Sequence, residues 1–138
     1  MSTVVVDASV WVSYVLREDV HHQTSHLWLT GHLRGGGLVV APTILLAEVG
    51  GPVARQTGDL TLARNTYREL LQLPTLRIVP IDYRLGTATA TLAINLGLRA
   101  ADAVYVALAQ ILAIPLITWD EQQRTRSATT ITAAIPTL

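Results

Sequence analysis

Short apolar runs rich in β-branched residues alternate along this chain with longer segments of mixed polarity. The runs occupy residues 3–6, 38–41, 76–80 and 116–118, and residues 130–133 are a candidate for a final edge strand. Continuous apolar runs this short are typical of strands buried on both faces of a parallel sheet. The alternation therefore predicts an α/β sandwich, in which helices pack around a mainly parallel sheet.

The segments between the runs carry helical signals. Asp59 and Asp82 are suited to cap helices, and Gly97 is suited to end one. Asp120 opens a short polar segment that also predicts a helix. We expect the other helices at residues 10–16, 20–33, 59–73, 82–96 and 101–112.

One more helix is predicted around Glu48. Pro42 suits its first turn, and the Gly-Gly-Pro sequence at residues 50–52 predicts a kink or a break in it. No repeat, linker or low-complexity tract interrupts the pattern. A chain of 138 residues suits one core, so we expect a single domain over residues 1–138.

The composition excludes several classes of protein. Charged residues make up 14% and hydrophobic residues 50% of the chain, which excludes disorder. Ten basic residues, all arginine, are balanced by ten acids, which argues against coating nucleic acid through bulk charge. The absence of cysteine excludes disulfides and thiolate metal sites.

The same composition bears on the location of the protein. The N-terminus lacks the basic region of a secretory signal, and the longest apolar stretch, residues 104–119, is too short to span a bilayer. We therefore expect a cytoplasmic protein that does not interact with a membrane. The excess of apolar residues predicts that a partner or a second copy covers part of the surface.

Four acids stand in apolar surroundings. Asp7 and Asp120 each follow a predicted strand, and ligands bind at the carboxyl edge of parallel sheets. Glu48 and Asp102 lie in helical segments whose neighbours are almost all apolar. A buried, unpaired carboxylate is costly or becomes neutral through a shift of its pKa. Arg99, one turn before Asp102, can pair with it, but no basic residue lies within a turn of Glu48.

Such a set of carboxylates suits a divalent cation. All-oxygen sites select hard ions, here Mg²⁺ or Mn²⁺ rather than Zn²⁺. An ion of this kind can activate water for attack on a phosphodiester, and two ions about 4 Å apart can stabilise both the attacking and the leaving oxygen. The structural alternative is that Asp7 and Asp120 only cap helices and that Asp102 only pairs with Arg99. Glu48 is the hardest to explain in this way.

The segments around these acids resemble those of PIN-domain nucleases. They are Val-Val-Val-Asp7-Ala-Ser9, Ala-Glu48, Leu-Arg99-Ala-Ala-Asp102-Ala and Ile-Thr118-Trp-Asp120, in this order along nearly the whole chain. The resemblance is strongest to the VapC-type toxins of bacterial and archaeal toxin–antitoxin pairs. It implies a three-layer α/β/α fold around a parallel sheet and an endoribonuclease activity that depends on Mg²⁺ or Mn²⁺.

The resemblance also implies roles for individual residues. Asp7, Glu48 and Asp102 match the acids that hold the principal metal ion. Asp120 matches the fourth acid, which helps to bind a second ion or to orient water. The family likeness further implies a homodimer and a cognate antitoxin that blocks the groove.

Residues that support the site or bind RNA can be named as well. By resemblance, Ser9 and Thr118 match positions where a small polar side chain often supports the acids. Because the chain has no lysine, contacts with RNA must come from arginines. The candidates are Arg17, Arg99, Arg124 and Arg126.

Other interpretations remain open. The alternatives to a nuclease toxin are a catalytically silent PIN-fold module that binds a partner and an RNA-processing nuclease without an antitoxin. His22 and His26, one turn apart, are spaced like a zinc pair, but no acid on that helix completes a site. Trp119, directly before Asp120, is placed to stack on a base. Residues 121–126 are more polar than expected of a tightly packed helix.

Overall fold

The computed structural model describes residues 2–137 and contains a central sheet of five strands. The strands are β1 (Thr3–Val6), β2 (Leu38–Pro42), β3 (Leu76–Val79), β4 (Leu116–Ile117) and β5 (Ala133–Ala134). Their order is β3-β2-β1-β4-β5, and every neighbouring pair is parallel. The predicted parallel sheet is confirmed.

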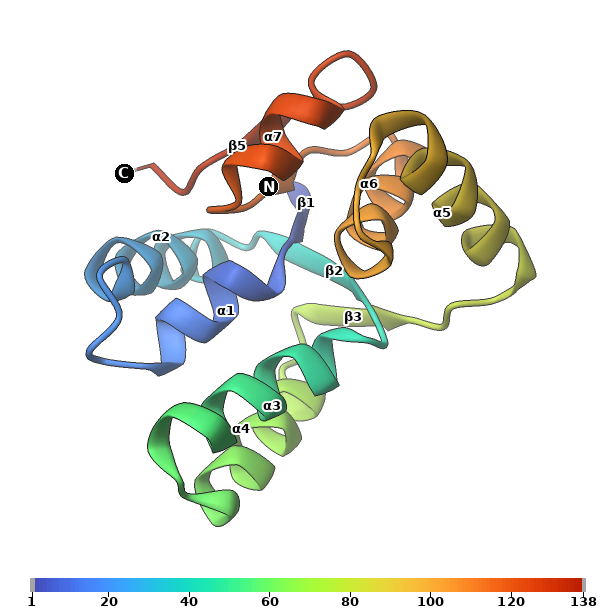
Figure 1. Cartoon of the computed structure of the whole chain (residues 1–138). Helices are drawn as coiled ribbons and strands as arrows, with labels where there is room; N and C mark the ends of the chain where they lie inside the picture. The colour runs from blue at the N-terminus through green and yellow to red at the C-terminus, as the bar shows by residue number, and fades with distance from the viewer. Residues whose placement is uncertain (1, 138) are drawn as a thin grey trace.

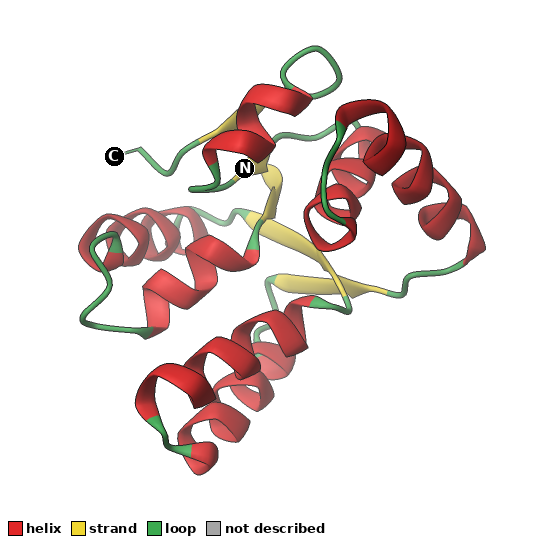
Figure 2. Cartoon of the chain, in the orientation of Figure 1, coloured by secondary structure: helices red, strands yellow, loops and turns green. Residues whose placement is uncertain are grey.

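Within residues 2–137, seven helices form layers on the two sides of this sheet. They are α1 (Ala8–Val15), α2 (His22–Arg34), α3 (Leu45–Thr57), α4 (Leu60–Gln72), α5 (Tyr83–Leu96), α6 (Ala100–Leu112) and α7 (Glu121–Ser127). Figure 1 shows α1–α4 on one side and α5 and α6 on the other, and Figure 2 shows the strands between them. Crossovers between parallel strands are right-handed, so the direction of each step across the sheet fixes the side of its helices. The steps from β1 to β2 and β3 run one way, and the step back to β4 runs the other way, so its helices α5 and α6 lie on the opposite side. The α/β/α sandwich is confirmed.

The core is centred on α6 and the central strands. Every residue from 103 to 109 is buried, because α6 is apolar on all sides and contacts β1, β2 and β4. Val5 of β1, Val39 of β2 and Trp11 of α1 are also almost completely buried. Full burial of one such aliphatic side chain contributes about 1.5–3 kcal/mol. This packing fixes the strands whose carboxyl ends carry acids.

The strand order reverses at β1. From β1 the chain adds β2 and β3 on one side, and later β4 and β5 on the other. In such sheets ligands bind at the carboxyl edge beside the reversal, where the diverging connections leave a crevice. Asp7 follows β1 and Asp120 follows β4 closely at this edge.

The prediction that Pro42 begins a helix is wrong. Pro42 is the last residue of β2, where it lies opposite Val79, and α3 begins only at Leu45. The amides of Val39 and Thr43 donate to carbonyls on the β3 side. The nitrogen of Pro42 therefore faces β1, beyond the last paired residue of that strand, so proline removes no hydrogen bond from the sheet.

Of the kink or break predicted at residues 50–52, the break does not occur. The helix α3 continues to Thr57 with Pro52 inside it. Proline has no amide hydrogen, so the carbonyl of Glu48 lacks its usual donor four residues on. Val49 and Val53, on either side of Pro52, are completely buried, and this packing offsets the lost bond.

The final edge strand is displaced from its predicted place at residues 130–133. It spans Ala133–Ala134. The two amides at residues 130 and 131 donate to the carbonyl of Ser127, which holds this stretch in a turn after α7. Hydrogen bonding to β4 begins only at Thr132, whose carbonyl accepts from the amide of Leu116.

Across the described residues, no single helix has both the length and the apolar character needed to cross a membrane. The helices α5 and α6 meet that criterion only as a pair, and they are bent by 113° relative to each other.

Candidate active site

Four carboxylates lie where four helices begin, at the carboxyl edge of the sheet. Asp7 caps α1 and Asp120 caps α7, each by accepting a hydrogen bond from a backbone amide. Glu48 and Asp102 lie in the first turns of α3 and α6, where no side chain caps the helix. Each position puts negative charge at the positive end of a helix dipole, which lowers the cost of gathering these acids.

Asp7 is the most enclosed of the four acids, with 6% of its surface exposed. Its Oδ2 accepts hydrogen bonds from the amide of Ser9 at 3.0 Å and the hydroxyl of Thr118 at 3.2 Å. The Nε2 of Gln123 lies 3.5 Å from Oδ1. Burial still raises the pKa of Asp7, and the charge of Asp102 raises it further, although hydrogen bonds from Ser9 and Gln123 lower it. The surroundings therefore only partly compensate the charge of Asp7.

Glu48 is half-buried and lies within electrostatic range of two other acids. Burial is the largest cause that raises the pKa of Glu48, and the charges of Asp7 and Asp102 also raise it. The hydroxyl of Tyr105 donates a hydrogen bond of 2.8 Å to Oε1 of Glu48. Burial and the charge of Glu48 raise the pKa of Tyr105, so the phenol stays protonated and remains a donor.

Asp102 is paired with an arginine. Nε of Arg99 lies 3.1 Å from Oδ2 of Asp102, in the one ion pair found among the described residues. The side chain of Arg99 is 86% exposed and that of Asp102 is 18% exposed, so water screens this attraction on the arginine side. Three of the four acids therefore have no basic partner within ion-pair distance in the described chain.

Ser9 and Thr118 join the ends of β1 and β4 beside Asp7. Their hydroxyl oxygens lie 3.3 Å apart, and Thr118 donates to Asp7. The hydroxyl of Ser9 accepts from the amide of Trp119, and the hydroxyl of Thr118 accepts from the amide of Asp120, both at 3.1 Å. These bonds fix the chain on either side of Asp120 relative to Asp7.

Gln123 contacts the site although no sequence pattern indicates it. It lies in the polar segment after Asp120, yet it is completely buried. Its side-chain Nε2 donates to the backbone carbonyl of Asp102 at 3.0 Å and approaches Asp7. Its backbone amide donates to Oδ1 of Asp120 at 3.0 Å. Its Oε1 is buried and has no hydrogen-bond partner among the described residues. The polar segment predicts that Gln123 is exposed. It is buried because its hydrogen-bond partners come from distant parts of the chain.

Tyr105 is a second contact that the sequence analysis does not identify, although the sequence contains a signal for it. It follows Asp102 by three residues, so both side chains project from the same face of α6. A completely buried tyrosine needs a partner for its hydroxyl, and Glu48 is that partner.

The candidate RNA-binding arginines are divided in space. Arg99 lies at the acids, and NH1 of Arg124 donates to the carbonyl of Thr118 at 2.9 Å. Arg126 bonds instead to the carbonyl of Gly97, at the turn between α5 and α6.

Arg17 is not brought to the acids. It follows the far end of α1 and lines a surface hollow together with His22 and His26. The rings of these two histidines lie 5.8 Å apart, and His22 bonds to the carbonyl of Ser13 while His26 stacks on Tyr14. These contacts account for both histidines without a metal.

The chemistry of the acid edge fits a hard divalent cation. All the donors are carboxylate oxygens, neighbouring acidic charges raise the pKa values of Asp7 and Glu48, and the arginine at the edge is exposed. As the side chains lie, however, no group of three or more acids and histidines in residues 2–137 is compact enough to hold an ion. Binding an ion there therefore requires the carboxylates to draw together.

Comparisons with known proteins relate the chain to one family. The family model of the PIN domain matches residues 4–127. Comparison with curated proteins gives no significant match. Similar solved structures include VapC20 of Mycobacterium tuberculosis, a sarcin-ricin loop cleaving toxin, with a TM-score of 0.76 and 17% identity over 94% of this chain and 96% of that one.

Two other solved structures extend the likeness. FitAcB of Neisseria gonorrhoeae has a TM-score of 0.71 and 19% identity over 96% of this chain and 97% of that one. VapBC-5 of M. tuberculosis, from the VapBC family of toxin–antitoxin systems, has a TM-score of 0.62 and 20% identity over 98% of both chains. These identities are low, so the likeness demonstrates a shared fold. With the family match over most of its length, the chain belongs to the PIN domain family.

Proposed function

We propose that this chain is an endoribonuclease that depends on Mg²⁺ or Mn²⁺, and that it is the toxin of a type II toxin–antitoxin pair. The observation that carries the proposal is the gathering of four carboxylates at the sheet edge with one exposed arginine beside them. Helix capping accounts for two of these acids but not for Glu48 and Asp102. The similarity to VapC20 and to VapBC-5 supports the toxin assignment.

The proposed roles follow from how each acid is held. When bound, the ion would activate water and neutralise charge on the phosphodiester. The residues that would hold the principal ion are Asp7, Glu48 and Asp102, with Asp120 as the auxiliary acid that binds a second ion or orients water. Thr118 and Ser9 orient Oδ2 of Asp7 through hydrogen bonds, and the phenol of Tyr105 orients Glu48. These contacts would restrict the acids to the geometry that cleavage needs.

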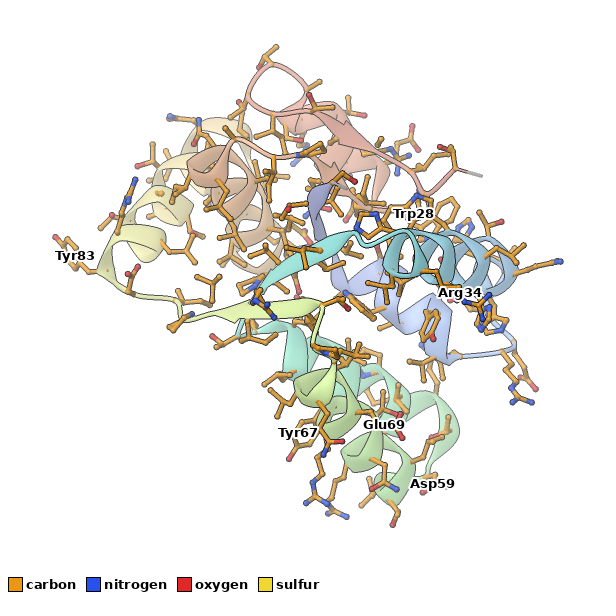
Figure 3. The ribbon with its side chains drawn as sticks, turned by 180° about the vertical axis from the view of Figure 1, so that it is seen from behind. Trp28, Arg34, Asp59, Tyr67, Glu69 and Tyr83 are labelled. Carbon is orange, nitrogen blue, oxygen red and sulfur yellow. The ribbon has the colours of Figure 1, made fainter. Side chains whose placement is uncertain are left out.

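The partners in this proposal are RNA, a cognate antitoxin and a second copy of the chain, in the cytoplasm. Arg99 and Arg124 are placed to meet RNA phosphates, and an antitoxin would place a basic side chain at the acids. On α5, Tyr83 is 88% and Ile94 is 81% exposed, and a spacing of eleven residues puts them on one helix face. Figure 3 labels Tyr83 at the end of this face, which we propose as part of a dimer contact.

A ribonuclease assay tests the proposal. Purified protein is incubated with single-stranded RNA and Mg²⁺ or Mn²⁺, and the fragments are resolved by gel electrophoresis. Wild type and Asp59→Asn, a matched helix-cap variant on α4, are expected to cleave, whereas Asp7→Asn is expected to lose at least about 100-fold in rate. Cleavage that survives EDTA, or equal cleavage by Asp7→Asn, contradicts the proposal.

A catalytically silent PIN-fold module is the second candidate. The observation in its favour is that the acids form no compact set of metal ligands within residues 2–137. A folded protein that forms a stable complex with a partner, yet neither binds Mn²⁺ nor cleaves RNA, would establish this alternative. An RNA-processing role without an antitoxin would keep the chemistry, and an adjacent gene for a small DNA-binding protein would argue against it.

A further inference from the structure

An aromatic pair includes Trp119, whose backbone amide donates to Ser9 next to the acid edge. The rings of Trp119 and His21 are stacked, with centroids 3.8 Å apart and planes within 8° of parallel. Trp119 stands in the chain between Thr118, which donates to Asp7, and Asp120, which caps α7. Both aromatic residues are partly exposed. The pair therefore offers a partly exposed aromatic surface on the residue that directly precedes Asp120 in the chain.

Hydrogen bonds hold the ring of Trp119 and the backbone of His21 in place. Nε1 of Trp119 donates to Oγ of Ser25 at 2.8 Å, and Ser25 is completely buried with its hydroxyl 2.6 Å from that of Ser13. The amide of His21 donates to Oδ1 of Asp19 at 2.8 Å, which fixes the start of α2. Because these residues are already ordered, stacking a ligand on them costs the protein little side-chain entropy.

A positive charge lies beside the same pair. NH1 of Arg124 donates to the carbonyl of Thr118, whose peptide bond leads into Trp119. Arg124 is only partly exposed, and this bond limits where its guanidinium can go. Stacking rings next to an arginine match the two parts of a nucleotide, its base and its phosphate.

We propose that His21, Trp119 and Arg124 form a subsite for one nucleotide of single-stranded RNA, next to the phosphodiester that is cleaved. The base stacks on the exposed side of the His21–Trp119 pair, and a neighbouring phosphate meets Arg124. This inference rests on the proposed ribonuclease function and adds a preference to it. Because a base must leave its duplex to stack on a protein ring, the subsite selects unpaired RNA, such as a loop, over paired RNA.

The chain offers a matched control. Trp28 and His32 form a second stacked pair on α2, with centroids 5.2 Å apart and planes within 9° of parallel, and both are partly exposed. Figure 3 labels Trp28 on this helix, which carries none of the four acids. Loss of the His32 ring therefore removes a similar stack without touching the proposed subsite.

The test measures affinity for a fluorescent single-stranded hexaribonucleotide by anisotropy, with Ca²⁺ in place of Mg²⁺ to avoid turnover. Base–aromatic stacking predicts that His21→Ala weakens binding about 5- to 100-fold, while His21→Phe, which keeps a ring, stays within about threefold of wild type. His32→Ala is expected to bind as wild type does. Arg124→Gln is expected to weaken binding and to reduce its dependence on salt.

Oligonucleotides with one abasic position separate stacking from a structural effect. At the position that occupies the subsite, removing the base should weaken wild type, and His21→Ala should then add little, because both changes remove the same contact. If His21→Ala binds intact RNA as wild type does while wild type cleaves RNA, the subsite is refuted and the nuclease stands. If His21→Ala weakens every abasic RNA to the same extent, the effect is structural and the subsite is also refuted. If wild type neither binds nor cleaves RNA, both proposals fall.

Discussion

At the scale of single residues, the site is governed by how little of its negative charge the protein compensates. Asp7 is buried at the end of β1, and burial is the largest cause that raises its pKa. In the absence of a cation, its ionised form therefore works against folding. In the proposed cation site, function and stability would therefore be opposed at this residue, as is common where a site is built to hold a ligand.

The variant Asp7→Asn tests this opposition. Because the folded pKa of Asp7 lies above its ordinary value of 3.8, wild-type stability falls as pH rises from 3.8 through the folded pKa. Asparagine has no charge to bury and still caps a helix. Without metal at pH 7, we expect Asp7→Asn to be more stable by about 1 kcal/mol, which raises Tm by about 4 °C in a domain of this size.

Thermal melts of both proteins at pH 7 and pH 4 in EDTA measure the effect. The gain should shrink at pH 4, where the wild-type carboxyl is closer to neutral. Asp59→Asn, at the exposed cap of α4, should differ little from wild type at either pH. A Tm of Asp7→Asn below that of wild type at pH 7 would show that Asp7 is compensated in the folded protein.

Gln123 carries a second prediction at this scale. It links Asp102, Asp120 and Asp7 from a completely buried position. We expect Gln123→Ala to lose about 2–4 kcal/mol of unfolding free energy, because it removes hydrogen bonds and leaves a cavity. Urea denaturation measures this loss, and Gln122→Ala, at the exposed neighbour, should stay within about 0.5 kcal/mol of wild type. Equal effects of the two variants would contradict the linking role.

The sequence alone indicates some of these residues and not others. Glu48 and Asp102 could be singled out because an acid among apolar neighbours is unusual in any fold. Gln123 could not, because a glutamine in a polar segment is normally exposed. Its burial depends on tertiary contacts with α6 and with Asp7, which local composition does not record.

At the scale of the elements, local signals predicted the helices well. Asp59, Asp82 and Asp120 all cap helices through their side chains, as expected from residue type. Pro42 and Pro52 were misjudged, because the effect of proline depends on whether its missing amide had a partner. That is settled by the strand register and by core packing rather than by the local sequence.

Two glycines associated with α5 give a paired prediction. Gly97 ends the helix at φ 66°, in the left-handed region, so Gly97→Ala should cost about 1 kcal/mol. Gly86 is inside the helix and a Cβ there would meet nothing within 4 Å, so Gly86→Ala should stabilise by about 0.5–1 kcal/mol. Urea denaturation gives both values. Changes of the same sign would contradict the assigned end of α5.

At the scale of the whole molecule, the topology brings the acids together. The strand order reverses at β1, and helices on both sides of the sheet begin at the same edge. The alternation of strands and helices in the sequence predicted this architecture. It could not predict how far apart the carboxylates lie without a cation, since that depends on side-chain positions and on Arg99.

The binding of Mn²⁺, measured by isothermal titration calorimetry, tests most directly whether the acid edge is a cation site. Asp59, labelled in Figure 3, caps α4 at the end remote from the acids. Wild type and Asp59→Asn should therefore bind the ion equally. Asp7→Asn should bind it at least about tenfold more weakly, since even residues that only orient metal ligands contribute this much. A wild-type protein that binds no Mn²⁺, or an Asp7→Asn variant that binds it as tightly as wild type, would contradict the account.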